Sequence, residues 1–158
     1  MLASAAVVTL VAVVSACSFD ALPTDDTGKG GTDELDEALS DYDLQLPTDA
    51  SEITYTVHTS IDSHAVGVRL RTTTAGLDEL LASLGRSQVD LKLGMNPWED
   101  SPRLSSNSPE RYGWDLASIT DYAGVEVQSA SSLGSTGVLV DVRAPGAPIV
   151  YVEALSCC

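Results

Sequence analysis

Two neighbouring segments of this chain alternate between apolar and polar side chains, and this period of two constrains the fold more than any other feature. Segment 53–59 has Ile, Tyr, Val and Thr at every second position, and segment 66–71 has Val, Val and Leu there. Successive side chains of a β-strand point to opposite faces of a sheet, so each segment predicts a strand with one buried face. Asp62 and Ser63 favour a turn between them, which predicts an antiparallel hairpin.

Three further strands are predicted near the end of the chain. They cover 125–129, 138–143 and 149–154, and a glycine with two prolines at 145–148 marks the turn between the last two. The segment 86–124 lacks a sustained period and contains three prolines, so we expect it to form a long irregular connection.

One amphipathic helix is predicted over 75–84. Its leucines recur at the spacing i, i+3, i+4 and i+7, at Leu77, Leu80, Leu81 and Leu84. Thr74 is a suitable N-cap and Gly85 a suitable C-terminal stop. The order β-β-α-loop-β-β-β predicts an α+β domain with an antiparallel sheet of about five strands and one helix packed on one face.

The start of the chain predicts a secretory signal. Residues 2–16 carry no charge, and about 15 apolar residues are too few to span a membrane core, which needs roughly 20. They suffice for the apolar region of a signal peptide. The ending Val14-Ser15-Ala16-Cys17 resembles the lipobox of bacterial lipoproteins, with a branched apolar residue three positions before the cysteine and a small residue directly before it.

The lipobox resemblance implies cleavage before Cys17, diacylglycerol on its sulfur, and a lipid anchor on the extracytoplasmic face of the cell membrane. One departure from such signals is that no Lys or Arg precedes the apolar run. Two alternatives remain for 1–17, namely an ordinary signal peptide that has Cys17 near its end, and a buried core helix.

An acidic stretch follows the signal. Ten acids and one lysine lie between Asp20 and Asp49, a composition that opposes formation of a packed core. We therefore expect a signal peptide at 1–16, a lipidated Cys17 with an acidic flexible tether over 17–43, and one α+β domain over 44–158. A short helix could form within the tether over 32–40.

The charge balance restricts the partners. With 23 acids against 8 bases, the chain is unsuited to nucleic acid, whose binding depends on neutralised phosphates. The same balance opposes adsorption to anionic lipid by net charge, so membrane attachment is expected through the lipid on Cys17.

Two stretches of the domain resemble uncharacterised small lipoproteins of high-GC Gram-positive bacteria. They are LPTDASEI at 46–53 and RLRTTTAGLDELLASLG at 69–85. The resemblance extends over most of the domain and implies no known activity.

Catalytic signatures are absent from the sequence. It has no GxSxG, SxxK or HExxH motif, and no cofactor or metal motif with the required spacing. His58 and His64 flank the first predicted hairpin turn, where Asp62 could complete a weak metal site, and Glu99 lies beside Asp100 in the long connection. Solvated side chains explain both groups more simply. If either group were functional, the chain would be a cell-envelope hydrolase with a site near His58 or Glu99, and this is the alternative function.

Two candidate binding surfaces stand above this background. Arg69 and Arg71 share one face of the second strand with His58 of the first. This arrangement suits an anionic ligand, or cross-strand pairing with Asp141 or Glu126 on a solvated face. Trp98 and Trp114 lie in the long connection, which suits recognition of carbohydrate or an envelope protein, or a second small core. We expect Trp114 to pack inward and Trp98 to stay accessible. The expected function is a non-enzymatic, membrane-anchored binding or interaction module.

Overall fold

A computed structural model describes residues 32–60, 63–105, 109–128 and 134–157. The predicted signal, Cys17, Asp62 and most of the predicted tether lie outside this part of the chain. The elements in order are α1 (Thr32–Ser40), β1 (Ser51–Thr59), β2 (Ser63–Arg71), α2 (Thr74–Ser83), η1 (Gln88–Asp90), β3 (Lys92–Leu93), α3 (Pro97–Asp100), η2 (Pro109–Tyr112), η3 (Leu116–Ser118), β4 (Tyr122–Gln128), β5 (Ser135–Asp141) and β6 (Ile149–Cys157).

The strands form one antiparallel sheet in the order β1-β2-β6-β5-β4-β3. This confirms the predicted α+β class and antiparallel sheet. The sheet has six strands because the short β3 pairs with β4 at the edge, through Lys92 opposite Gly124 and Leu93 opposite Ala123.

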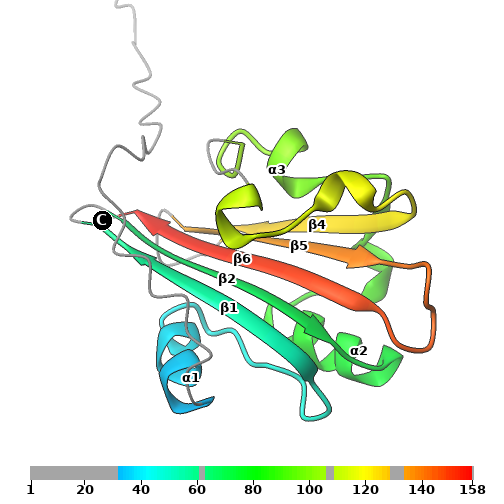
Figure 1. Ribbon diagram of the computed structural model, residues 1–158, viewed down its shortest axis with the longest axis horizontal. Coiled ribbons are helices and arrows are strands. Elements are labelled where there is room, and N and C mark those ends of the chain that lie inside the picture. Colours follow the sequence, from blue (N-terminus) through cyan, green and yellow to red (C-terminus); the bar gives the residue numbers. More distant parts are fainter. Residues whose placement is uncertain (1–31, 61–62, 106–108, 129–133, 158) are drawn as a thin grey trace, which may run out of the picture.

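Each face of the sheet is covered by a different kind of layer (Figure 1). Helices α1 and α2 lie on one side, which we call the helix face, and the segment with α3, η2 and η3 lies on the other, which we call the loop face. The helix face is almost entirely aliphatic, with Val68, Val152 and Val138 in one row across three central strands.

Helix α2 matches the sequence prediction closely. Leu77, Leu80 and Leu81 are buried against the sheet, and Gly85 follows the helix in the left-handed region at φ 66°. The N-cap is Thr73, one residue before the predicted one, and its hydroxyl accepts a hydrogen bond from the Gly76 amide.

Helix α1 corrects the predicted domain boundary. Leu35 and Leu39 lie at i and i+4 on this helix, and both are buried in the same core as Leu44. The packed part of the chain therefore includes α1 and does not begin at residue 44. Among the described residues, no helix has the length and apolarity needed to cross a bilayer.

Candidate functional site

The loop face contains a fully buried carboxylate in the centre of the sheet. Glu153 of β6 is 0% exposed. Its register neighbours are glycines on both sides, Gly67 of β2 and Gly137 of β5. Burying a carboxylate is costly unless hydrogen bonds compensate it, so the contacts of Glu153 decide how this layer is held.

The flanking glycines let the covering segment approach the sheet. A Cβ atom at Gly67 would overlap the ring of Tyr112, and one at Gly137 would lie 2.7 Å from Leu104 Cδ1. Any side chain at either position would push the covering segment outward. The two glycines and Glu153 thus form a shallow trough that receives the loop layer.

Two side chains of the covering segment donate hydrogen bonds to Glu153. The Trp98 indole Nε1 donates to Oε2, and the Tyr112 hydroxyl donates to Oε1 at 2.7 Å. Burial, followed by the charge and hydrogen bond of Glu153, raises the pKa of Tyr112 far above its usual value, while Arg111 acts in the opposite direction. Tyr112 therefore stays protonated and serves as a donor.

Aromatic rings surround this carboxylate. Trp114 makes edge-to-face contacts with Trp98 at 5.6 Å and with Tyr151 at 5.5 Å between ring centroids, and a tilted contact with Tyr112 at 4.7 Å. Trp98 and Trp114 are each only 4% exposed. The predicted burial of Trp114 is confirmed. The predicted accessibility of Trp98 is wrong, because its indole turns inward to reach Glu153.

The two residues of the hydrolase alternative occupy different environments. His58 is buried on β1, with its ring 5.3 Å from that of Tyr112. Glu99 is exposed on α3 and accepts a hydrogen bond from the Asn96 side chain at 3.0 Å. His64, at the other predicted end of the hairpin turn, is exposed. No group of three His, Cys, Asp or Glu side chains suited to a metal ion occurs in the described part of the chain.

Three arginines gather at one end of the loop face, and we call Arg69, Arg71 and Arg143 the arginine patch. Arg71 donates from Nε to Glu52 at 2.9 Å and from Nη1 to the Ala147 carbonyl at 3.1 Å. Arg143 donates to both oxygens of Asp141, at 2.9 Å from Nε to Oδ1 and at 2.5 Å from Nη2 to Oδ2. Two of the three guanidinium groups are thus paired with carboxylates.

Asp141 is the carboxylate partner of Arg143 in the patch. Its hydrogen bonds from Arg143 hold its pKa below the ordinary value, and the charge of Arg71 adds to the effect. The same pairing raises the pKa of Arg143. Ile149 of β6 is the register partner of Asp141 on β5 and of Arg71 on β2. Three adjacent strands therefore position Asp141 and Arg71.

Arg69 differs from its two neighbours. Its guanidinium carbon lies 6.0 Å from the centroid of the Tyr151 ring, a cation–π contact. No ion pair or hydrogen bond of its guanidinium occurs among the residues that the structure describes. Arg69 is half-buried, and the contact with Tyr151 places its guanidinium at this end of the loop face.

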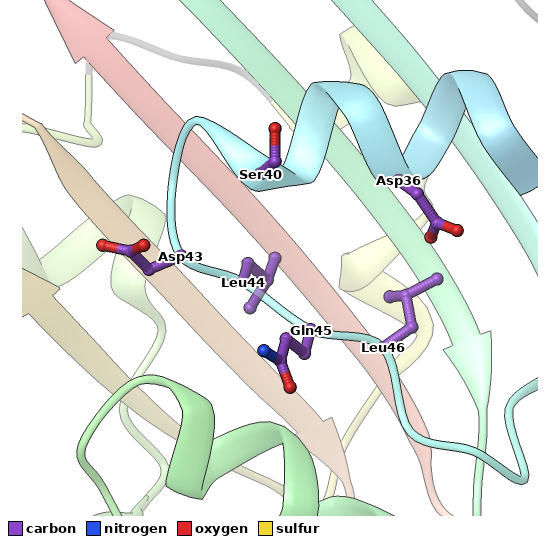
Figure 2. Close-up of a pocket in the computed structure, with 6 residues that line it drawn as sticks. All are labelled: Asp36, Ser40, Asp43, Leu44, Gln45 and Leu46. Carbon is purple, nitrogen blue, oxygen red and sulfur yellow. The ribbon is translucent and has the colours of Figure 1, made fainter.

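A separate groove lies on the other side of the sheet, between α1 and the segment that follows it (Figure 2). It has a volume of about 450 Å³ and is lined by Asp36, Ser40, Asp43, Leu44, Gln45 and Leu46. Asp36 and Asp43 lie toward its opposite ends and are exposed to solvent. Exposed acids on an open groove explain its polarity without a ligand.

The sequence interpretation missed Glu153. One signal was present: a single acid interrupts the apolar strand 149–154, on the face whose neighbouring strands carry glycines at the facing positions. The expected pairing of Arg69 or Arg71 with Asp141 or Glu126 is wrong. Arg71 pairs with Glu52 of β1, Asp141 pairs with Arg143, and Glu126 accepts a hydrogen bond from Ser135.

Comparison with known proteins identified no relative: no family model, curated protein or solved structure matches this chain.

Proposed function

We propose that this chain is a lipid-anchored, extracytoplasmic binding module, without catalytic activity of its own, whose ligand surface is the arginine patch. The anchoring part of the proposal rests on Val14 to Cys17 and their resemblance to a lipobox. The binding part rests on the patch at the end of the loop face, where basic groups gather on a chain with a formal net charge of −15.

The observation that carries the binding proposal is the state of Arg69. Its guanidinium is held against Tyr151, while the neighbouring Arg71 and Arg143 have acidic partners. A held guanidinium loses little side-chain freedom on binding, and its planar array of donors matches a carboxylate or phosphate. The ligand class is therefore an anion, either a small one or an acidic group of an envelope partner.

The buried cluster around Glu153 has a structural role in this proposal. Trp98, Trp114 and Glu153 are buried, Trp98 donates to Glu153 and Trp114 packs on Trp98, so these side chains offer a partner almost no accessible surface. Recognition of carbohydrate through exposed tryptophans has no support from this arrangement.

The binding proposal is tested by titrating the full chain with inorganic phosphate and with acetate. The arginine Nε–Hε signals are monitored by NMR during each titration. We expect the Arg69 signal to shift in a saturable way and the shift to be lost in Arg69→Gln. Arg103→Gln is the matched control, because it removes the same charge from an exposed position on the covering segment. Equal responses in the two variants would show nonspecific screening and reject the patch.

Anchoring has its own experiment. We expect the chain expressed in a bacterial host to enter the detergent phase on partitioning, and Cys17→Ser to remain in the aqueous phase. A wild-type chain found in the aqueous phase would contradict the anchor.

The hydrolase alternative can be tested against the binding module directly. A hydrolase screen on the full chain, with His58→Ala and Glu99→Gln as paired variants, should show no turnover that depends on either side chain. Turnover lost in either variant would replace the binding module with an enzyme.

A further inference from the structure

The most exposed large apolar side chains lie on or just before the edge strand β3 and directly after β5. Among the described residues, the exposed large hydrophobics are Val89 at 91%, Leu93 at 83% and Val142 at 36%. Leu93 of β3 pairs with Ala123, which pairs with Val140, two residues before Val142. Exposed apolar residues are common singly, but three at one end of a sheet indicate a contact surface.

Two cations lie close to Val89 and Leu93 in the sequence. Arg86 and Lys92 are exposed on either side of Val89, and no ion pair of theirs occurs in the part of the chain that the structure describes. The acid between them, Asp90, accepts hydrogen bonds from the Ser87 amide at 2.9 Å and hydroxyl at 3.1 Å. These bonds, and then the charge of Arg86, lower the Asp90 pKa.

The backbone holds this segment outward in a defined shape. Gly85 and Gly94 both lie in the left-handed region and bound the segment, and Leu91 between them packs against the core of the helix face. The Gly94 amide donates to the Tyr122 carbonyl at 2.9 Å, which ties the segment to β4. Val89 and Leu93 are therefore presented by a fixed backbone.

We infer that this edge patch, formed by Arg86, Val89, Lys92, Leu93 and Val142, docks onto the surface of a bilayer that contains anionic lipid. Apolar side chains flanked by cations are the combination that interfacial segments use, with the apolar groups inserted below headgroups that the cations contact. The inference rests on the proposed anchor, because the net charge of the chain opposes adsorption by an untethered domain.

The length of chain before α1 permits this contact. Fourteen residues separate Cys17 from Thr32, and they can reach at most about 50 Å when fully extended. A nine-residue strand such as β2 is about 30 Å long. An anchor at Cys17 can therefore coexist with docking at either end of the sheet, and tethering raises the local lipid concentration enough for a weak contact to matter.

The test uses the full chain with Cys157→Ser and Cys158→Ser, so that Cys17 is the cysteine that couples to maleimide lipid. The vesicles consist of phosphatidylglycerol and contain brominated phosphatidylcholine. Leu93→Trp reports on the patch, and Gln128→Trp, exposed at the opposite end of β4, is the matched control. Trp98 and Trp114 are buried and give a constant background.

We expect the brominated lipid to quench Leu93→Trp and leave Gln128→Trp at the background level. Adding Arg86→Glu and Lys92→Glu should abolish the difference. Equal quenching at both positions, or none at either, overturns the inference. Protection of Leu93→Trp without vesicles, together with a doubled mass in light scattering, would show that a second copy covers the patch and would also overturn it. Chemical coupling replaces biological lipidation in this experiment. A failed partitioning experiment would therefore reject the anchor, and the quenching result could still be interpreted.

Discussion

The helix face and the loop face of the sheet are held by different physics. On the helix face, Leu80 and Leu81 of α2 pack on valines of the central strands, and contact area supplies the stabilisation. On the loop face, an irregular segment is fastened by Trp98 and Tyr112 to one buried carboxylate. Apolar packing tolerates small adjustments of position, whereas a buried polar contact is either satisfied or costly. The loop face should therefore be more brittle than the helix face.

Glu153→Leu is the most severe test of the difference between the two faces. The substitution replaces the carboxylate with an apolar side chain and leaves the Trp98 and Tyr112 donors buried without their acceptor. Each such donor costs about 1–3 kcal/mol, so we expect the free energy of unfolding to fall by about 2–6 kcal/mol. Acrylamide quenching of the tryptophans should increase, because the loop layer loosens. Unchanged quenching and stability would show that Glu153 does not hold the layer.

Leu80→Ala is the corresponding change on the helix face. A buried leucine truncated to alanine costs about 2–5 kcal/mol in unfolding free energy, measured by urea denaturation. Below the unfolding transition, tryptophan quenching should stay at the wild-type level, since both tryptophans belong to the other layer. An increase equal to that of Glu153→Leu would mean that the two layers are not independent.

Gly67→Ala probes the trough with a single methyl group. The new Cβ would overlap the Tyr112 ring, and overpacking of this kind costs about 1–3 kcal/mol. Gly146→Ala is the control, because a Cβ there meets no atom within 4 Å, and we expect it to stay within about 0.5 kcal/mol of wild type. Similar thermal shifts in the two variants would contradict the close approach of Tyr112.

The smallest effect concerns acid stability, to which each face contributes one aspartate. Hydrogen bonds from Thr72 and Thr73 at the start of α2 lower the Asp49 pKa, and those from Arg143 lower the Asp141 pKa. A lowered folded-state pKa gives stability that is present above the unfolded value near 4 and is lost as the pH falls further. We expect Asp49→Asn and Asp141→Asn to flatten the decline of melting temperature between about pH 4 and 2. A wild-type slope in both would refute the assigned shifts.

The parts of the fold that depend on local patterns were predictable. The leucines of 77–84 predicted α2, and alternation predicted the long strands. Helix α1 was assigned to the tether because its acids dominate its composition, although Leu35 and Leu39 alone place it on the core. β3 is two residues long, and a two-residue strand carries almost no period.

The candidate site was less predictable because its contacts join distant positions. Trp98 lies beside Pro97 and two acids, neighbours that suggest exposure, yet its hydrogen-bond partner is 55 residues away. The arginines were identifiable, since Arg69 and Arg71 share a strand face by simple alternation. Which of them has a carboxylate partner depends on Glu52 and on the register of three strands, which the sequence does not specify locally.

The place of β6 has a consequence for how the chain reaches its folded state. This strand is the last of the six to be synthesised, yet it lies between β2 and β5 and joins the β1–β2 hairpin to the β3–β4–β5 meander. Until β6 is made, the two halves of the sheet have unpaired edges and no common core. Pairing of β6 with both halves joins positions far apart in the chain, so we expect completion of the sheet to be a late and slow step of folding.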